Sequence, residues 1–72
     1  MNYCEWADEY LRDARRVRFV IEKKKALLND KKLTSDERKN LNEAIGSYRK
    51  IYHELLKTAE HLRQRGERYR EA

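Results

Sequence analysis

The second half of the chain carries a regular apolar pattern. Nine positions between residues 41 and 69 follow one another at alternating steps of four and three, and seven of them hold large or medium-sized apolar residues. Such a repeat places one apolar stripe along an α-helix. The stripe consists of Leu41, Ile45, Tyr48, Tyr52, Leu55, Ala59, Leu62, Gly66 and Tyr69.

The first half of the chain repeats this pattern with the same spacing. Its stripe consists of Tyr3, Ala7, Tyr10, Ala14, Val17, Ile21, Lys24 and Leu28. The sequence therefore predicts two long amphipathic helices, each with a seam that faces the other helix.

The break between the helices is marked by polar residues. Asn29 and Asp30 disfavour a helix interior because their side chains compete for backbone hydrogen bonds. Thr34 and Glu37 are spaced as a capping box, in which Thr34 is the N-cap of the next helix.

We expect a single all-α domain over residues 1–72. Its parts are a helix at about 2–30, a turn at about 31–34 and a helix at about 35–69. A turn this short makes the helices antiparallel, so the predicted fold is a coiled-coil-like two-helix hairpin.

Two staggers satisfy the seam pattern. In the preferred one Tyr3 lies opposite Gly66 and large residues face small ones in most layers. In the other, Lys24 lies opposite Arg38, which places two positive charges together in the seam. Size and charge therefore favour the first stagger.

Further apolar residues flank the two seams, and a lone hairpin cannot cover all of them. Fully burying each such side chain contributes roughly 1.5–3 kcal/mol, so leaving them in water is costly for a small domain. A twofold homodimer that forms a four-helix bundle would cover them. The predicted dimer interface consists of Trp6, Leu11, Val20, Leu27, Ile51 and Leu56, and Ala44 belongs to the same row as Ile51. Larger homo-oligomers, docking on another protein and a broader hairpin core remain alternatives.

The charge distribution indicates mostly solvated helix faces. Charged residues make up 43% of the chain, the formal net charge is +5, and many acids stand three residues before a base. In residues 14–25 basic residues outnumber acidic ones, and this stretch also contains the aromatic Phe19. The candidate contacts for a protein partner or nucleic acid are Arg15, Arg16, Arg18, Phe19, Lys23, Arg49 and Lys50. Shielding of Phe19 by a neighbouring subunit or by the stems of nearby basic residues is the simpler explanation.

The sequence offers no arrangement typical of an enzyme or a metal site. His53 and His61 are eight residues apart, no Glu-x-x-His tetrapeptide occurs, and Cys4 is the single cysteine. We therefore expect no catalytic residues, no metal ligands and no cofactor. The longest apolar run spans three residues, so we expect no membrane segment and a cytoplasmic location.

Two resemblances concern the helical hairpin itself. Leu33-Thr34 and the segment from Leu41 to Gly46 resemble the loop and second helix of small sporulation-type aspartyl-phosphate phosphatases. Asn42 and Gly46 stand where that family has a serine and an aspartate, so the resemblance implies no phosphatase activity. The expected architecture is also similar to the RNA-binding helical-hairpin dimer of plasmid copy-number control.

Two functions follow as expectations. The first is a small non-enzymatic helical protein–protein interaction module, a homodimeric adaptor or inhibitor of mobile-element or bacterial origin. The alternative is an RNA- or DNA-binding helical-hairpin dimer that uses the basic patch around Phe19. The expected partners are a second copy and an unidentified protein, with nucleic acid as the alternative and no membrane or small-molecule substrate.

Overall fold

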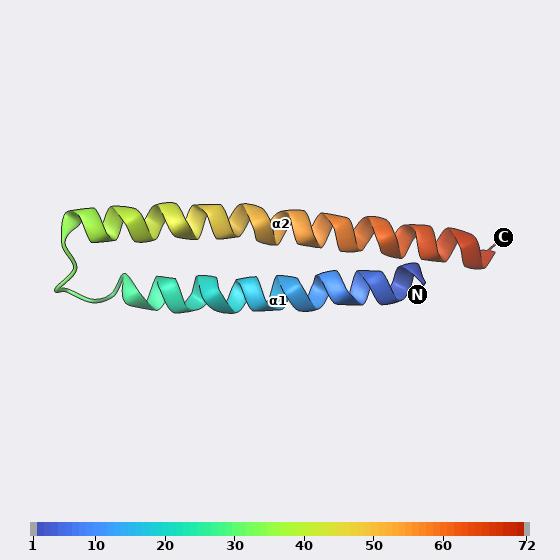
Figure 1. The fold of residues 1–72 in the computed structure, drawn as a ribbon, viewed down its shortest axis with the longest axis horizontal. Coiled ribbons are helices and arrows are strands. Elements are labelled where there is room, and N and C mark those ends of the chain that lie inside the picture. The colour runs from blue at the N-terminus through green and yellow to red at the C-terminus, as the bar shows by residue number, and fades with distance from the viewer. Residues whose placement is uncertain (1, 72) are drawn as a thin grey trace.

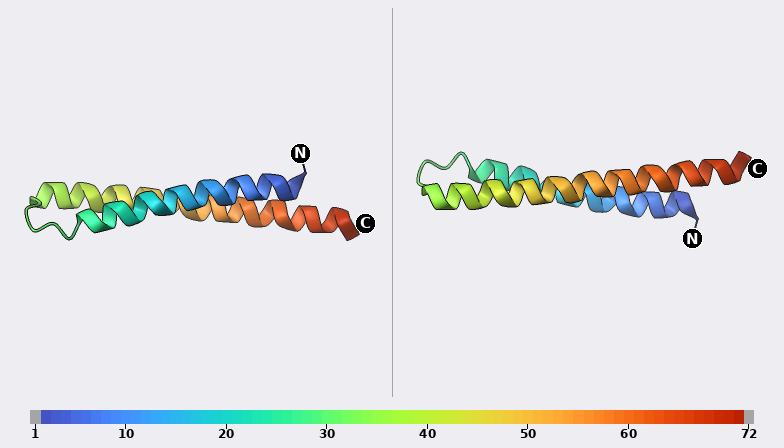
Figure 2. Two further views of the ribbon diagram at one scale, coloured as in Figure 1. Left: turned by 90° about the horizontal axis from the view of Figure 1, so that it is seen from below. Right: turned by 90° about the horizontal axis from the view of Figure 1, so that it is seen from above.

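The chain folds as two antiparallel helices joined by one turn (Figure 1). The computed structural model describes the backbone of residues 2–71 and the side chains of residues 2–67. Helix α1 spans Tyr3–Leu27 and α2 spans Ser35–Glu71, and they pack along their length, which confirms the predicted all-α hairpin. The molecule measures 58 × 15 × 14 Å between Cα atoms, and the helices cross at a shallow angle (Figure 2).

Side chains outside each helix satisfy its first backbone N–H groups. Asn2 caps α1 by accepting a 2.8 Å hydrogen bond from the backbone N–H of Glu5, and the Glu5 carboxylate accepts one from the N–H of Asn2. At α2 the Thr34 hydroxyl accepts a 3.1 Å bond from the N–H of Glu37 and donates to the Glu37 carboxylate. The cap at Thr34 is the one that the sequence predicts, whereas the Asn2 cap was not among the predictions.

Helix α1 ends at Leu27, earlier than the expected end at about residue 30. The backbone N–H groups of residues 28, 29 and 30 each bond to the carbonyl three residues back, which tightens the last turn. The Asp30 carboxylate then accepts a 2.9 Å bond from the N–H of Lys32, and this side-chain bond replaces the helical pattern. The turn therefore begins earlier than the sequence indicates.

Arg38 ties the two sides of the turn together. Its guanidinium donates a 2.9 Å hydrogen bond to the carbonyl of Leu28 and a 3.5 Å bond to the carbonyl of Asp30. These carbonyls lie at and just beyond the end of α1, where no intrahelical N–H reaches them. A side chain from the first turn of α2 thus caps the C-terminus of α1.

The helices adopt the preferred stagger. Gly66 lies against Tyr3 and Cys4, and Tyr10 shares a surface hollow with Thr58 and Leu62. The alternative stagger would instead place Tyr10 level with Tyr52 and Lys24 level with Arg38. The Lys24 ammonium lies 5.7 Å from the centroid of the Tyr48 ring. This charged seam residue therefore makes a cation–π contact with the opposite helix. The expected seam position at Tyr69 has its side chain outside the described residues.

The fully buried core is narrow and built largely from small residues. Within residues 2–67, buried side chains recur every seven residues on α1, and two lie fourteen residues apart on α2. They are Ala7, Ala14 and Ile21 on α1 and Ile45 and Ala59 on α2. The alanines lie in the half of the hairpin away from the turn, and the isoleucines lie in the half near the turn.

Candidate interaction surfaces

One long edge of the hairpin, which we call the apolar edge, carries a row of residues that includes four large apolar side chains. Each residue of this row directly precedes a seam position, so the row lies beside the seam on the same side of the molecule. The apolar edge consists of Trp6, Asp13, Val20 and Leu27 on α1 and Ala44, Ile51, Thr58 and Arg65 on α2. The structure therefore places Trp6, Val20, Leu27 and Ile51 of the predicted dimer interface on one surface.

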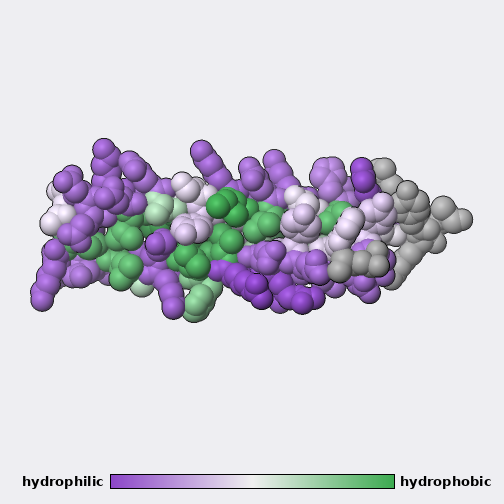
Figure 3. All heavy atoms as spheres, in the orientation of Figure 1, coloured by the Kyte–Doolittle hydropathy of each residue, from purple (hydrophilic) through white to green (hydrophobic). Residues whose placement is uncertain are grey.

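These apolar side chains are not covered by the hairpin. Trp6 is 46% exposed, Leu27 is 54% exposed and Ile51 is 44% exposed, while Val20 and Ala44 are half-buried. Figure 3 shows a hydrophobic band between two charged borders on one face, most continuous in the half nearest the turn. An exposed, rimmed apolar patch of this kind is typical of a protein interaction site.

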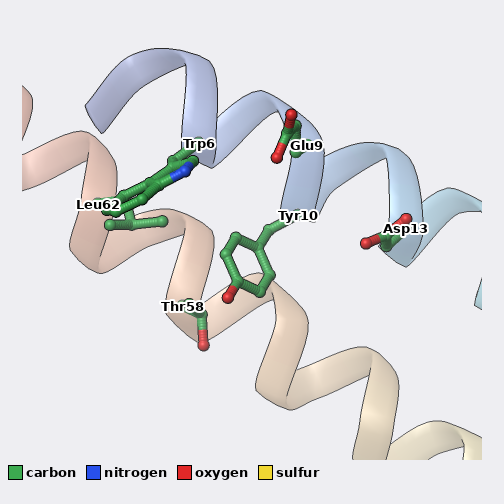
Figure 4. A pocket seen from close by; sticks show the side chains of 6 residues that line it. All are labelled: Trp6, Glu9, Tyr10, Asp13, Thr58 and Leu62. Atoms are coloured by element: carbon green, nitrogen blue, oxygen red, sulfur yellow. The ribbon is translucent and has the colours of Figure 1, made fainter. Parts of the chain in front are cut away.

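A hollow of about 430 Å³ interrupts the apolar edge near the open end (Figure 4). The Tyr10 ring extends from α1 towards Thr58 of α2, and the Trp6 indole lies next to Leu62. The carboxylates of Glu9 and Asp13 line its α1 side. The hollow is thus apolar at its floor and acidic at its rim.

Leu11 and Leu56 lie on the opposite edge. Each follows a seam position by four residues, Ala7 for Leu11 and Tyr52 for Leu56, and each is half-buried. The stagger brings them level with one another across the seam. They therefore broaden the hairpin core from that side, and one flat partner cannot contact them together with Trp6 and Ile51.

The predicted basic patch is divided among different surfaces. Phe19 comes two residues before buried Ile21, and Lys50 comes five after buried Ile45, so each lies on the face of its helix turned away from the seam. Because the two helices face each other, Phe19 and Lys50 point in opposite directions. No single ligand surface contains both.

Phe19 and two of its basic neighbours have local partners. Phe19 is 61% exposed, and the Lys23 ammonium lies 4.8 Å from its ring centroid. The Arg16 guanidinium lies 3.8 Å from the Asp13 carboxylate. This contact leaves most of the Phe19 side chain in water, so cover by the stems of the basic neighbours, the simpler explanation, does not account for Phe19.

Arg15, Arg18 and Arg49 form a smaller basic cluster on the edge that also holds Leu11 and Leu56. Arg18 and Arg49 each follow a seam position by four residues, and the stagger brings them level. Arg15 lies one turn from Arg18. All three are exposed, and none forms an ion pair with a side chain that the structure describes.

The remaining chemistry-bearing residues are dispersed. His53 contacts the Tyr52 ring edge-to-face, and His61 lines a shallow depression with Leu56, Lys57 and Glu60. Within the described residues, no three His, Cys, Asp or Glu side chains come together as metal ligands would. None of the described helices is both long and apolar enough to span a membrane.

Comparisons with family models, curated proteins and solved structures found no match for this chain. The resemblance to phosphatase hairpins therefore gains no support from them. Any function has to be argued from the surfaces described above.

Proposed function

We propose that the chain is a small, non-enzymatic protein–protein interaction module that acts as a homodimeric adaptor or inhibitor, with the hairpins paired through their apolar edges. The observation that carries this proposal is the exposure of Trp6, Leu27 and Ile51 on a single edge. These are among the largest apolar side chains of the molecule, and the hairpin leaves about half of each in water.

The composition of the core supports the same conclusion. Three of the five residues that are buried among the described side chains are alanines, which bury little apolar area each. A domain below about 80 residues already buries a small fraction of its surface and usually needs a further source of stability. Covering half-exposed Trp6, Leu27 and Ile51 in two copies would supply on the order of 6 kcal/mol, at roughly 1 kcal/mol for each half-covered side chain.

A homodimer would still leave a surface for another protein. The outward face of α1 carries Phe19, which an apolar-edge dimer does not cover, and Lys23 lies beside it at the border of the apolar edge. An aromatic residue beside a basic one is a common anchor in protein interfaces. We assign to this face the contact with a partner that the adaptor or inhibitor would recognise.

The homodimer is tested by light scattering on the purified chain over a range of concentrations. The expected molar mass is twice the 8.8 kDa of one chain. Ile51→Lys places a charge in the interface and should return the mass to that of one chain. Phe19→Lys is the matched control, because Phe19 is also large, apolar and exposed but lies on the outward face, and it should remain dimeric.

Helical content measured by circular dichroism separates loss of pairing from loss of folding. A wild-type mass of 8.8 kDa at millimolar concentration would refute the homodimer. The same conclusion follows if Ile51→Lys and Phe19→Lys behave alike.

Nucleic-acid binding is the second candidate, and the cluster of Arg15, Arg18 and Arg49 supports it. These guanidinium groups lie exposed on one edge and have no ion-pair partner among the described side chains. Exposed guanidinium groups on one surface suit phosphate oxygens along a nucleic-acid backbone.

A salt titration of binding to a labelled RNA and a labelled DNA duplex tests this candidate. Affinity should fall as salt rises, and replacing all three arginines by glutamate should abolish it at low salt. Replacing Lys50, Lys57 and Lys39 by glutamate makes the same change in net charge elsewhere and is the control. Absence of binding at low salt, or equal losses in the two triple variants, would remove this candidate.

A further inference from the structure

The stagger of the helices divides the apolar edge into four successive layers. Counting along the antiparallel pair, Val20 is level with Ile51 and Leu27 is level with Ala44. These two layers are apolar and lie in the half of the hairpin near the turn. Towards the open end follow a polar layer of Asp13 with Thr58 and a mixed layer of Trp6 with Arg65.

Two copies can place these edges face to face by a twofold axis in two ways. An axis parallel to the helices puts both turns at the same end and stacks α1 of each copy on α2 of the other. An axis perpendicular to the helices puts the turns at opposite ends and stacks α1 on α1. Both interfaces use the same patch on each copy, so symmetry alone does not choose between them.

The order of the layers favours turns at the same end. In that arrangement each layer packs on the same layer of the second copy. Val20 then packs on Ile51 of the second copy, and Leu27 packs on Ala44 of the second copy. The reversed arrangement with full overlap instead brings the Val20 layer onto the Asp13 layer. Apolar side chains would then cover polar ones, and the free energy gained from burial would fall.

In a third arrangement the reversed hairpins are shifted along their length so that apolar layers meet, but this leaves part of the apolar edge uncovered. The Val20 layer of each copy can be brought onto the Leu27 layer of the other, but only the halves near the turns then overlap. Trp6 would extend beyond the contact and remain exposed. The arrangement with both turns at one end is the only one of the three that covers Trp6, Leu27 and Ile51 together and also packs the two apolar layers on apolar layers.

Charges that border the apolar edge agree with this choice. Arg16 on α1 and Glu54 on α2 each follow a seam position by two residues, and the stagger makes them level. With both turns at one end, Arg16 of one copy faces Glu54 of the other, and Glu9 faces His61. In the reversed pair with full overlap, Arg16 would face Arg16 of the other copy and Glu54 would face Glu54, which is repulsive at both places, and Glu9 facing Lys23 would offset only part of this.

The size of the edge is sufficient for a stable dimer. A body 58 Å long and 15 Å wide between Cα atoms presents one long face of the order of 800 Å² per copy, which is about the area of a standard specific interface. Only full overlap of the two hairpins uses all of this face.

We propose, resting on the homodimer proposed above, that the two hairpins pair along their apolar edges with both turns at the same end. The partner on this edge is a second copy of the chain. Each α1 packs against α2 of the other copy, and the hollows near Tyr10 and Thr58 face one another to form a polar layer. The two clusters of Arg15, Arg18 and Arg49 then lie on opposite outer sides of the bundle.

Spin-label distance measurements decide the arrangement. One label is placed in the turn at Lys31→Cys and, in a separate protein, one at the open end at Glu67→Cys, both in a Cys4→Ser background. Both positions are exposed and neither lies on the apolar edge. Circular dichroism and light scattering of each labelled protein confirm that it remains a folded dimer.

With both turns at one end, the two labels at either position lie at the same end of the bundle, and both distances should be shorter than about 35 Å given helix diameters of about 10–12 Å. At 1.5 Å per residue, the fully overlapped reversed pair gives about 40 Å or more at both positions, and the slid pair gives a short turn distance with about 55 Å at the open end. Either of these results would overturn the arrangement while leaving the homodimer standing. Absence of any dipolar coupling together with a mass of 8.8 kDa would instead refute the homodimer itself.

A cross-linking experiment provides an independent readout. A tagged Leu27→Cys chain and an untagged Ala44→Cys chain, each with Cys4→Ser, are mixed and oxidised. The expected product is the covalent heterodimer, because these positions are level in adjacent copies. A covalent dimer from tagged Trp6→Cys and untagged Leu27→Cys chains, formed in its place, would support the reversed pair and contradict the proposal.

Discussion

Gly66 of α2 lies directly against Cys4 of α1, because a β-carbon placed on Gly66 would come 3.0 Å from the Cys4 Sγ and 3.5 Å from the Tyr3 Cβ. This distance to Sγ is shorter than ordinary van der Waals contact. Near the open end the seam therefore uses a glycine on α2 and alanines at Ala7 and Ala59, which let the two backbones approach closely.

Replacing Gly66 by alanine should have little effect on stability in the wild type and a stabilising effect once the Cys4 sulfur is removed. Alanine is favoured over glycine inside a helix by about 1 kcal/mol, but in the wild type its methyl group meets the Cys4 sulfur and cancels most of that gain. In a Cys4→Ala background the sulfur is absent, and Gly66→Ala should stabilise the protein. Thermal unfolding of the four proteins in a double-mutant cycle measures the coupling, and a coupling near zero would contradict the close contact.

Gly46→Ala should stabilise the protein without any second change. Gly46 lies inside α2, is exposed, and a β-carbon there would have no heavy atom within 4 Å. The expected gain is about 1 kcal/mol, from helix propensity alone. For a domain of this size this corresponds to a rise in Tm of about 4–8 °C. A decrease in Tm would indicate that Gly46 contacts a partner surface in the assembled protein.

The fold and the stagger could be predicted from the sequence because local and long-range signals agree. The seam spacing fixes which side of each helix is buried, and Thr34 with Glu37 marks where the second helix begins. The pairing of Gly66 with Tyr3 followed from matching large residues with small ones. The sequence predicts a later end for the first helix than the structure has, and the Arg38 side chain that caps this end comes from the other helix, where the local pattern of the first helix gives no sign of it.

The candidate surfaces were only partly predictable, since helical phase decides which residues share a face. Phe19 and Lys50 are level along the hairpin, yet they occupy outward faces of opposite helices. Leu11 and Leu56 belong to the edge opposite Trp6 for the same reason. Helical phase shows which residues share a face but not which partner the face binds, because a flat helical face has no catalytic group and no shaped pocket from which a ligand could be inferred.

Arg38→Ala should destabilise the turn by about 1 kcal/mol, since it removes the hydrogen bonds to the carbonyls of Leu28 and Asp30. Arg38→Lys should restore little of this loss because an ammonium group lacks the planar fork that reaches both carbonyls. Lys39→Ala is the control, as Lys39 is exposed in the same helical turn and makes no contact across the turn. Equal changes in Tm for the alanine variants of Arg38 and Lys39 would show that the cap contributes nothing.

Two isoleucines of α2 separate the stability of the hairpin from that of the dimer. Ile45 is 4% exposed in the seam, and Ile51 is 44% exposed on the apolar edge. Ile45→Ala should cost about 2–5 kcal/mol at every protein concentration, because it opens a cavity inside each hairpin. Ile51→Ala should cost little in the dissociated chain, but it should weaken pairing, so its Tm should lie further below that of the wild type as protein concentration rises. Thermal unfolding at micromolar and millimolar concentration distinguishes the two: a difference between wild type and Ile51→Ala that does not change with concentration would mean that Ile51 stabilises only its own hairpin.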